Sequence, residues 1–203
     1  DSISTEFGGR GDEVHMFPLS FSEFMTVYDG HKYDGWNEYV TYGGIPIVVL
    51  ASTEEQKIKL LDNLFNETYI KDIVNRHKIR NAGEMEALLD FLASAIGTLT
   101  NPNKLQKTFK SINHSKITAT TITKYIDYLE DAFLVEKASR YDIKGKSYIG
   151  TPQKYYFMDM GLRNARINFR QQEVTHSMEN VIYNELRMRG FGVDVGTVSY
   201  THL

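Results

Sequence analysis

The stretch KLQKTFKSINHSKITATTITKYIDYLEDAFLVEKASRYDIKGKSYIGTPQKYYFMD, residues 104–159, decides the fold that this sequence predicts. Apolar residues recur at helical spacing in residues 105–112 and, after a short turn, in residues 122–133. The pattern then changes to the period of two that is typical of strands, first in residues 135–142 and again in residues 154–159. Helix, turn, helix, strand, loop and strand is the order of a winged helix.

The predicted winged helix has a definite core and a definite start to its second helix. Thr118 precedes that helix and is expected to cap its N-terminus. The side chains expected in the core are Leu105, Phe109, Ile126, Leu129, Phe133 and Tyr155.

The turn Gly145-Lys146-Ser147 between the two strands matches the end of a phosphate-binding loop. However, Arg140 stands where such a loop needs its first glycine, and no helix follows the turn. We therefore interpret these residues as the turn of the wing.

Helical patterns dominate both flanks of this stretch. Ser20 followed by Glu23 forms a capping box, whereas residues 13–19 before it alternate like a strand. Residues 47–50 form either a buried strand or the first turn of a helix after Pro46.

Near the end of the sequence, residues 175–189 predict an amphipathic helix, and a strand is expected in residues 191–195. The helix is expected to turn Met178, Val181, Ile182 and Leu186 inward.

Composition narrows the class of protein. Hydrophobic residues make up 41 % and charged residues 24 % of the 203 residues, which is typical of a globular chain with a sizeable core. The net charge of −3 argues against a surface coated for nucleic acid, although a local basic patch stays compatible with it. The chain has no cysteine, and its apolar runs are too short to span a membrane. We expect a cytoplasmic protein with no membrane partner.

Five strings carry a family resemblance: PLSFSEF at residues 18–24, YGGIP at 42–46, YIKDI at 69–73, YYFMDMGLR at 155–163 and ENVIYNEL at 179–186. They resemble a large family of prokaryotic AAA-type ATPases, in which the ATPase core precedes a C-terminal domain of unknown function. The resemblance implies that the phosphate-binding loop and the magnesium-binding strand lie before Asp1. The last residues, 198–203, depart from the family pattern, which suggests truncation or a foreign tail.

The resemblance implies a C-terminal portion of an ATP-hydrolysing protein, mainly α with minor β. Residues 1–46 would end the ATPase core and link it onward, residues 47–103 would form a helical, lid-like bundle, and residues 104–163 the winged helix. Residues 164–203 would begin a truncated, restriction-endonuclease-like α/β end. ATP and Mg²⁺ would bind the longer protein but not this portion alone. Its partners would be the missing ATPase core and, through self-association, other copies.

Two residues have candidate roles that depend on this resemblance. Arg10 occupies a position that resembles an arginine finger, which neutralises charge developing on a γ-phosphate. Glu179 resembles the first acidic residue of nuclease-like folds, where several carboxylates hold Mg²⁺. His176 lies three residues before Glu179, but the further Asp and Glu-x-Lys that such a site needs are absent up to Leu203.

The predicted winged helix also has candidate nucleic-acid contacts. Its second helix presents Lys124 but also Asp127, Glu130 and Asp131, so its exposed face is partly acidic and unsuited to the major groove. The lysines expected to border this helix and the wing are Lys104, Lys107, Lys110, Lys116, Lys144, Lys146 and Lys154. The hydroxyls expected to donate to phosphates are those of Thr120, Thr121 and Thr123.

This sign pattern favours contact with the DNA backbone or with a protein over base reading. Two functions therefore remain open from the sequence: the C-terminal portion of an AAA-type ATPase, and a stand-alone winged-helix module that binds DNA or a partner protein.

Overall fold

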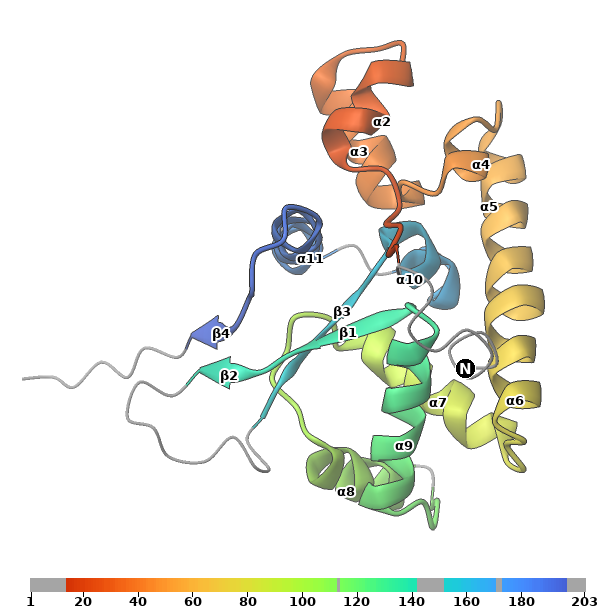
Figure 1. Ribbon diagram of the computed structural model, residues 1–203. Coiled ribbons are helices and arrows are strands. Elements are labelled where there is room, and N and C mark those ends of the chain that lie inside the picture. Colours follow the sequence, from red (N-terminus) through yellow and green to blue (C-terminus); the bar gives the residue numbers. More distant parts are fainter. Residues whose placement is uncertain (1–13, 113, 142–151, 171–172, 197–203) are drawn as a thin grey trace, which may run out of the picture.

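The computed structural model describes residues 14–112, 114–141, 152–170 and 173–196, and in these residues the chain is mainly helical with minor β structure, as expected (Figure 1). The helices are α2 (Phe21–Val27), α3 (Lys32–Tyr42), α4 (Pro46–Val49), α5 (Glu54–Asn63), the π-helical η1 (Leu64–Ile70), α6 (Lys71–Arg76), α7 (Ala82–Ser94), α8 (Pro102–Ile112), α9 (Ala119–Asp131), α10 (Met160–Arg166) and α11 (Val174–Met188). The strands are β1 (Val135–Ala138), β2 (Arg140–Tyr141), β3 (Lys154–Phe157) and β4 (Val195–Gly196). None of the helices in this part of the chain is both long and apolar enough to cross a membrane.

The strands form two small pairs. β1 and β3 are antiparallel, and their register places Val135 opposite Phe157 and Ala138 opposite Lys154. β2 pairs in parallel with β4 through Val195 and Gly196. Of the strand expected in residues 191–195, only Val195 is paired in the described part of the chain. In Figure 1 the β1–β3 ribbon crosses the middle of the molecule, with α8 and α9 at one end and α11 on one side.

Local capping rules predict several helix starts correctly. The Ser20 hydroxyl accepts a hydrogen bond from the Glu23 N–H while the Glu23 carboxylate accepts from the Ser20 N–H, which completes the capping box. Thr118 likewise caps α9 by accepting from the Thr121 N–H. Pro46 occupies the first turn of α4, so residues after it are helical rather than a buried strand.

The strand expected in residues 13–19 is wrong, since residues 14–19 pair with no strand. Leu19 instead donates its N–H to the Gly44 carbonyl at 2.8 Å and accepts from the Tyr39 hydroxyl at 2.8 Å. These single contacts satisfy the Leu19 backbone without a ladder.

One apolar core joins the helical bundle to the α8–α9–β1–β3 unit. Of the six core side chains expected in that unit, Leu105, Phe109, Ile126, Leu129 and Tyr155 are buried. Phe133 is the exception: it is 48 % exposed, its φ is +55°, and its ring lies 4.3 Å from that of His15. The left-handed turn after α9 directs Phe133 outward, and Leu134 takes the buried position instead.

The expectation for α11 is also corrected. Val181 is buried, but Met178 is 44 % and Ile182 is 51 % exposed. Leu186 is half-buried. The buried face of α11 is mixed: it holds the polar Ser177, Asn180 and Asn184 together with Val181 and Tyr183.

α10 and α3 approach so closely that their contact requires a glycine. A Cβ atom on Gly161 would lie 2.1 Å from the carbonyl oxygen of Tyr42 and 2.5 Å from its carbonyl carbon. Because these are backbone atoms, the two helices cannot keep their spacing with a larger residue.

We expect Leu129→Ala to lower the free energy of unfolding by about 2–5 kcal/mol, because Leu129 is fully buried and truncation leaves a cavity. Ile112→Ala, at a site 71 % exposed, is the matched control and should change it by no more than about 0.5 kcal/mol. Urea denaturation measures both values. Equal effects would contradict the described packing of α9.

We expect Gly161→Ala to destabilise the fold by about 1–3 kcal/mol, since α3 must move away from α10. Gly192→Ala is the control, because no atom lies within 4 Å of the Cβ position of Gly192. Thermal melting of the two variants should separate them. A Gly161→Ala variant as stable as the wild type would show that the helices do not pack this closely.

Candidate functional site

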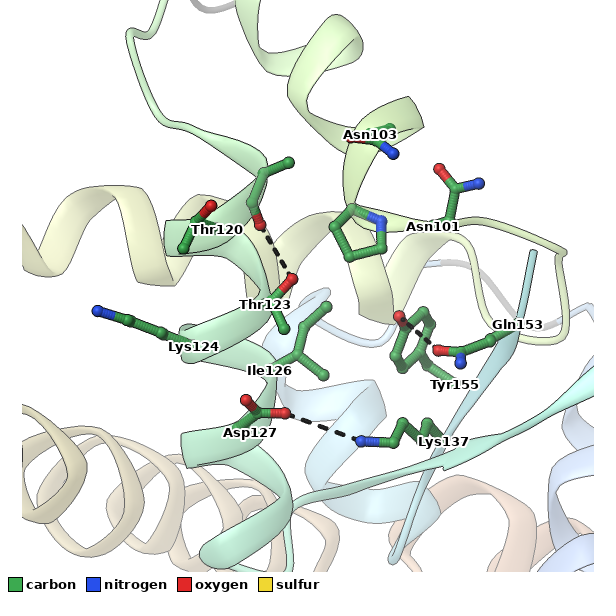
Figure 2. Close-up of a pocket in the computed structure, with 12 residues that line it drawn as sticks. Asn101, Asn103, Thr120, Thr123, Lys124, Ile126, Asp127, Lys137, Gln153 and Tyr155 are labelled. Carbon is green, nitrogen blue, oxygen red and sulfur yellow. Dashed lines mark hydrogen bonds and ion pairs between the residues drawn. The ribbon is translucent and has the colours of Figure 1, made fainter. Parts of the chain in front are cut away.

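A pocket of about 470 Å³ lies where the start of α8, one face of α9 and the strands β1 and β3 meet (Figure 2). Its lining combines apolar and polar side chains: Asn101, Pro102, Asn103, Ala119, Thr120, Thr123, Lys124, Ile126, Asp127, Lys137, Gln153 and Tyr155. The amides of Asn101 and Asn103 lie at the start of α8, and the hydroxyl and charged groups of Thr120, Thr123, Lys124 and Asp127 lie on α9. Lys137 comes from β1 and Tyr155 from β3.

Backbone hydrogen bonds fix the α8 side of the pocket to the sheet. Thr100 and Gln153 exchange two backbone hydrogen bonds, at 2.9 and 2.7 Å. The residues just before α8 are thereby held against the residue that precedes β3. Asn101 then caps α8 by accepting from the Lys104 N–H at 2.8 Å. The Tyr155 hydroxyl donates to the Gln153 side chain at 3.3 Å, which closes the floor of the pocket.

Lys137 lies on β1, in the wall of the pocket opposite α8, and offsets negative charge there. It lies directly across from Tyr155 in the β1–β3 register. Its Nζ atom is 2.8 Å from a carboxylate oxygen of Glu130 and 3.8 Å from one of Asp127. Partial burial acts to lower the pKa of Lys137, but the hydrogen bond and charge of Glu130 and the charge of Asp127 outweigh it and raise the pKa. One protonated lysine thus serves two carboxylates of α9.

The helices around the pocket are basic although the chain is acidic. Between Asp90 and Asp127 the sequence contains no acidic residue, and its only lysines or arginines are Lys104, Lys107, Lys110, Lys116 and Lys124. All five lysines are exposed, and within the described residues none of them forms an ion pair. Positive charge is therefore concentrated on α8, the turn and the first half of α9.

The three threonines of α9 differ in what they can donate. The Thr123 hydroxyl donates to the Ala119 carbonyl at 3.0 Å, and the Thr121 hydroxyl lies 3.0 Å from that of Thr118. In the part of the chain that the structure describes, the exposed Thr120 hydroxyl makes no hydrogen bond. Of the three, Thr120 is thus the clearest donor for a ligand.

The structure separates the site residues expected from the sequence. Lys124 lines the pocket, whereas Arg10, Lys144, Lys146 and the expected wing turn 145–147 lie outside the described residues, as does the tail 198–203.

Glu179 lies away from the pocket, on α11. Its carboxylate accepts from Lys154 at 2.5 Å and from the Tyr156 hydroxyl at 2.6 Å. Partial burial favours its protonated form, but these hydrogen bonds outweigh burial and lower its pKa. His176 lies 3.7 Å from the same carboxylate, and no group of three His, Asp or Glu residues in the described part could hold a metal ion. Lys154, expected at the wing, instead helps to attach α11 to β3.

Lys137, Asn101 and Gln153 are the site residues that the sequence analysis missed. The period-two pattern of residues 135–142 was a signal for Lys137, since it places Lys137 on the same side of β1 as the buried Val135. No local signal indicates Gln153, whose partner Thr100 is distant in sequence.

Comparison with known proteins supplies a family but no described activity. The sequence profile of a domain of unknown function, DUF8612, matches residues 33–173. An uncharacterized protein of Haemophilus influenzae is 36 % identical over 96 % of this chain and 49 % of its own length. An uncharacterized protein of Methanocaldococcus jannaschii is 28 % identical over 93 % of this chain and 44 % of its own length. The chain thus spans about half the length of these curated relatives. No solved structure matches it significantly.

These matches correct the resemblance to AAA-type ATPases. The profile that covers most of the chain is one of unknown function, and neither relative is described as an ATPase. The roles inferred from that resemblance lose their basis with it: ATP and Mg²⁺ as cofactors, a missing ATPase core as partner, and an arginine finger at Arg10.

Proposed function

The chain belongs to the family defined by the domain of unknown function DUF8612, and we propose from its own surface that the α8–α9–β1–β3 unit is a winged helix that binds the phosphate backbone of DNA. The order of its elements supports this proposal. α8, a short turn and α9 are followed by the antiparallel pair of β1 and β3, and residues 139–153 connect the two strands where a wing would be. α9 packs into the core through Ile122, Tyr125, Ile126 and Leu129, so its opposite face is available to a ligand.

The observation that carries the proposal is the segregation of charge. Five exposed lysines occur with no acidic residue between Asp90 and Asp127, in a chain whose net charge is −3. Lysines without carboxylate partners attract phosphates and displace the counterions that surround them. The polar pocket beside Lys124, with the unbonded hydroxyl of Thr120, offers additional donors to a backbone oxygen.

The composition of α9 favours backbone contact over base reading. Base edges in the major groove are read mainly by Arg, Asn, Gln and Lys, and α9 contains none of the first three. Its second half carries Asp127, Glu130 and Asp131, which would repel phosphates on both sides of a groove. We therefore propose binding with little dependence on base sequence.

A nuclease role for residues 164–203 is not part of this proposal. Glu179 is engaged by Lys154 and Tyr156, and its contacts attach α11 to β3. The alternative to DNA binding is that the same unit binds a partner protein.

We expect Lys124→Ala to weaken binding to a labelled DNA duplex of about two helical turns, because it removes one unpaired positive charge from the exposed face of α9. The plot of log affinity against log salt concentration should become shallower by about 1. Fluorescence anisotropy over a salt series measures both quantities. Lys59→Ala, an exposed lysine on α5 outside the unit, should leave the slope unchanged.

We expect Asp127→Asn to have the opposite effect and to strengthen binding, since it removes a carboxylate from the pocket and frees Lys137 from one of its two acidic neighbours. Two duplexes of unrelated sequence should bind each variant equally. No binding at low salt would contradict the proposal and favour the protein-binding alternative, as would binding that Lys124→Ala and Lys59→Ala weaken to the same degree.

A further inference from the structure

A second hollow in the surface lies between α2, α3 and α11. This groove has a volume of about 600 Å³, and its apolar residues include Phe21, Met25, Trp36, Ile182 and Leu186. Met178, one turn before Ile182 on α11, is also exposed. Contiguous apolar surface of this kind on a soluble chain marks a docking face.

The exposed positions of α11 follow the spacing of a coiled-coil seam. Thr175, Met178, Ile182, Glu185 and Arg189 are separated in turn by three, four, three and four residues. Thr175, Met178, Ile182 and Arg189 are exposed, and Glu185 is half-buried. Met178 and Ile182 are its apolar centre, and such a centre can pack against a second helix whose side chains insert between them.

The charges at the two ends of this seam favour an antiparallel second copy over a parallel one. Glu173, just before α11, is exposed and lies 3.4 Å from His176, and Arg189, just after α11, is exposed and lies 3.3 Å from Glu185. Thr175 and Arg189 lie seven residues to either side of Ile182. An antiparallel copy of α11 related by a two-fold axis at Ile182 would therefore bring each Arg189 to the end that carries the other copy's Glu173. A parallel copy would instead place Arg189 against Arg189.

We propose that the groove and the exposed face of α11 bind a second copy of this chain, with the two α11 helices antiparallel about Ile182. Each copy then contributes the same surface to the interface, as a two-fold axis requires. The macrodipoles of the two helices also oppose each other favourably in this arrangement. A helix of 15 residues is only about 22 Å long, so the interface is modest in area and a dimer of about micromolar affinity is expected.

The test is the oligomeric state of the full chain by sedimentation velocity, from about 1 to about 100 µM. The wild type should pass from monomer to dimer over this range. Ile182→Glu should raise the dissociation constant at least about tenfold, because each interface loses two buried isoleucines and gains two carboxylates. Leu50→Glu is the matched control: Leu50 is 75 % exposed and directly follows α4, a helix that lies away from α11 in Figure 1.

The absence of cysteine allows a second, geometric readout. Ile182→Cys introduces a single thiol at the proposed axis, so a short bifunctional maleimide should link two copies. Leu50→Cys should remain unlinked under the same conditions. Arg189→Glu should weaken the dimer, and adding Glu173→Arg should restore it, because the exchanged charges meet again across the axis. Circular dichroism checks that each variant is folded.

A wild type that stays monomeric throughout the range would overturn the proposal. So would a dimer that Ile182→Glu leaves intact, or one that Leu50→Glu weakens equally. Failure of Glu173→Arg to rescue Arg189→Glu would overturn the antiparallel arrangement.

Discussion

The rest of the structure depends on the buried hydrogen bonds that Arg163 and Asn164 of α10 make to neighbouring helices. Arg163 is 1 % exposed, and its guanidinium donates to the Ala93 carbonyl at 2.8 Å and to Asn164 at 3.0 Å. Asn164 in turn donates to the carbonyls of Val40 and Thr41, both at 2.9 Å. α10 therefore satisfies carbonyl groups near the C-terminal ends of both α3 and α7, where the helices have no intrahelical donors left.

Asp159 extends the same network to the turn after α3. Its carboxylate accepts from the N–H groups of Gly44 at 2.7 Å and Leu162 at 3.1 Å. Burial raises the pKa of Asp159 to about 6, and these backbone donors act in the opposite direction. Burial also lowers the pKa of Arg163, to about 10, which still leaves it charged at neutral pH. Removing either group would leave buried partners without hydrogen bonds, so the segment tolerates little change.

The buried amides of α11 explain how one helix can serve both the core and an exposed face. Asn180 accepts from the Phe157 N–H at 2.8 Å and donates to the Phe157 carbonyl at 2.7 Å, and Asn184 donates to the carbonyls of Phe157 and Met158. These side chains bind the free edge of β3 as a neighbouring strand would. Val181 and Tyr183 are buried on the same face of α11 as these amides, and the apolar residues Met178 and Ile182 are left on the surface, where the proposed dimer places them.

The proposed DNA-binding unit has a basic half and an acidic half. The basic half of the unit has no carboxylates nearby in sequence, so its lysines stay unpaired in the described structure. The acidic half of α9 meets Lys137 from β1, which offsets Asp127 and Glu130 without using any lysine of α8. The pocket thus lies at the boundary between the two halves.

The sequence by itself determined the features that depend on neighbours along the chain. Mainly helical structure, the caps at Ser20 and Thr118, and the burial of Leu105 and Leu129 followed from spacing and capping rules, because helices form through local hydrogen bonds. Lys124 could be placed on an exposed face for the same reason.

Only the tertiary structure decided which contacts form between distant segments. It turned Phe133 outward through a left-handed residue, paired Lys154 with Glu179, and brought Lys137 and Gln153 to the pocket. It also left Met178 and Ile182 of α11 exposed, since periodicity marks an apolar face as suited to a core but cannot show that Asn180 and Asn184 will bind the edge of β3. Such choices depend on the free energy of satisfying buried polar groups, which is set by partners far away in sequence.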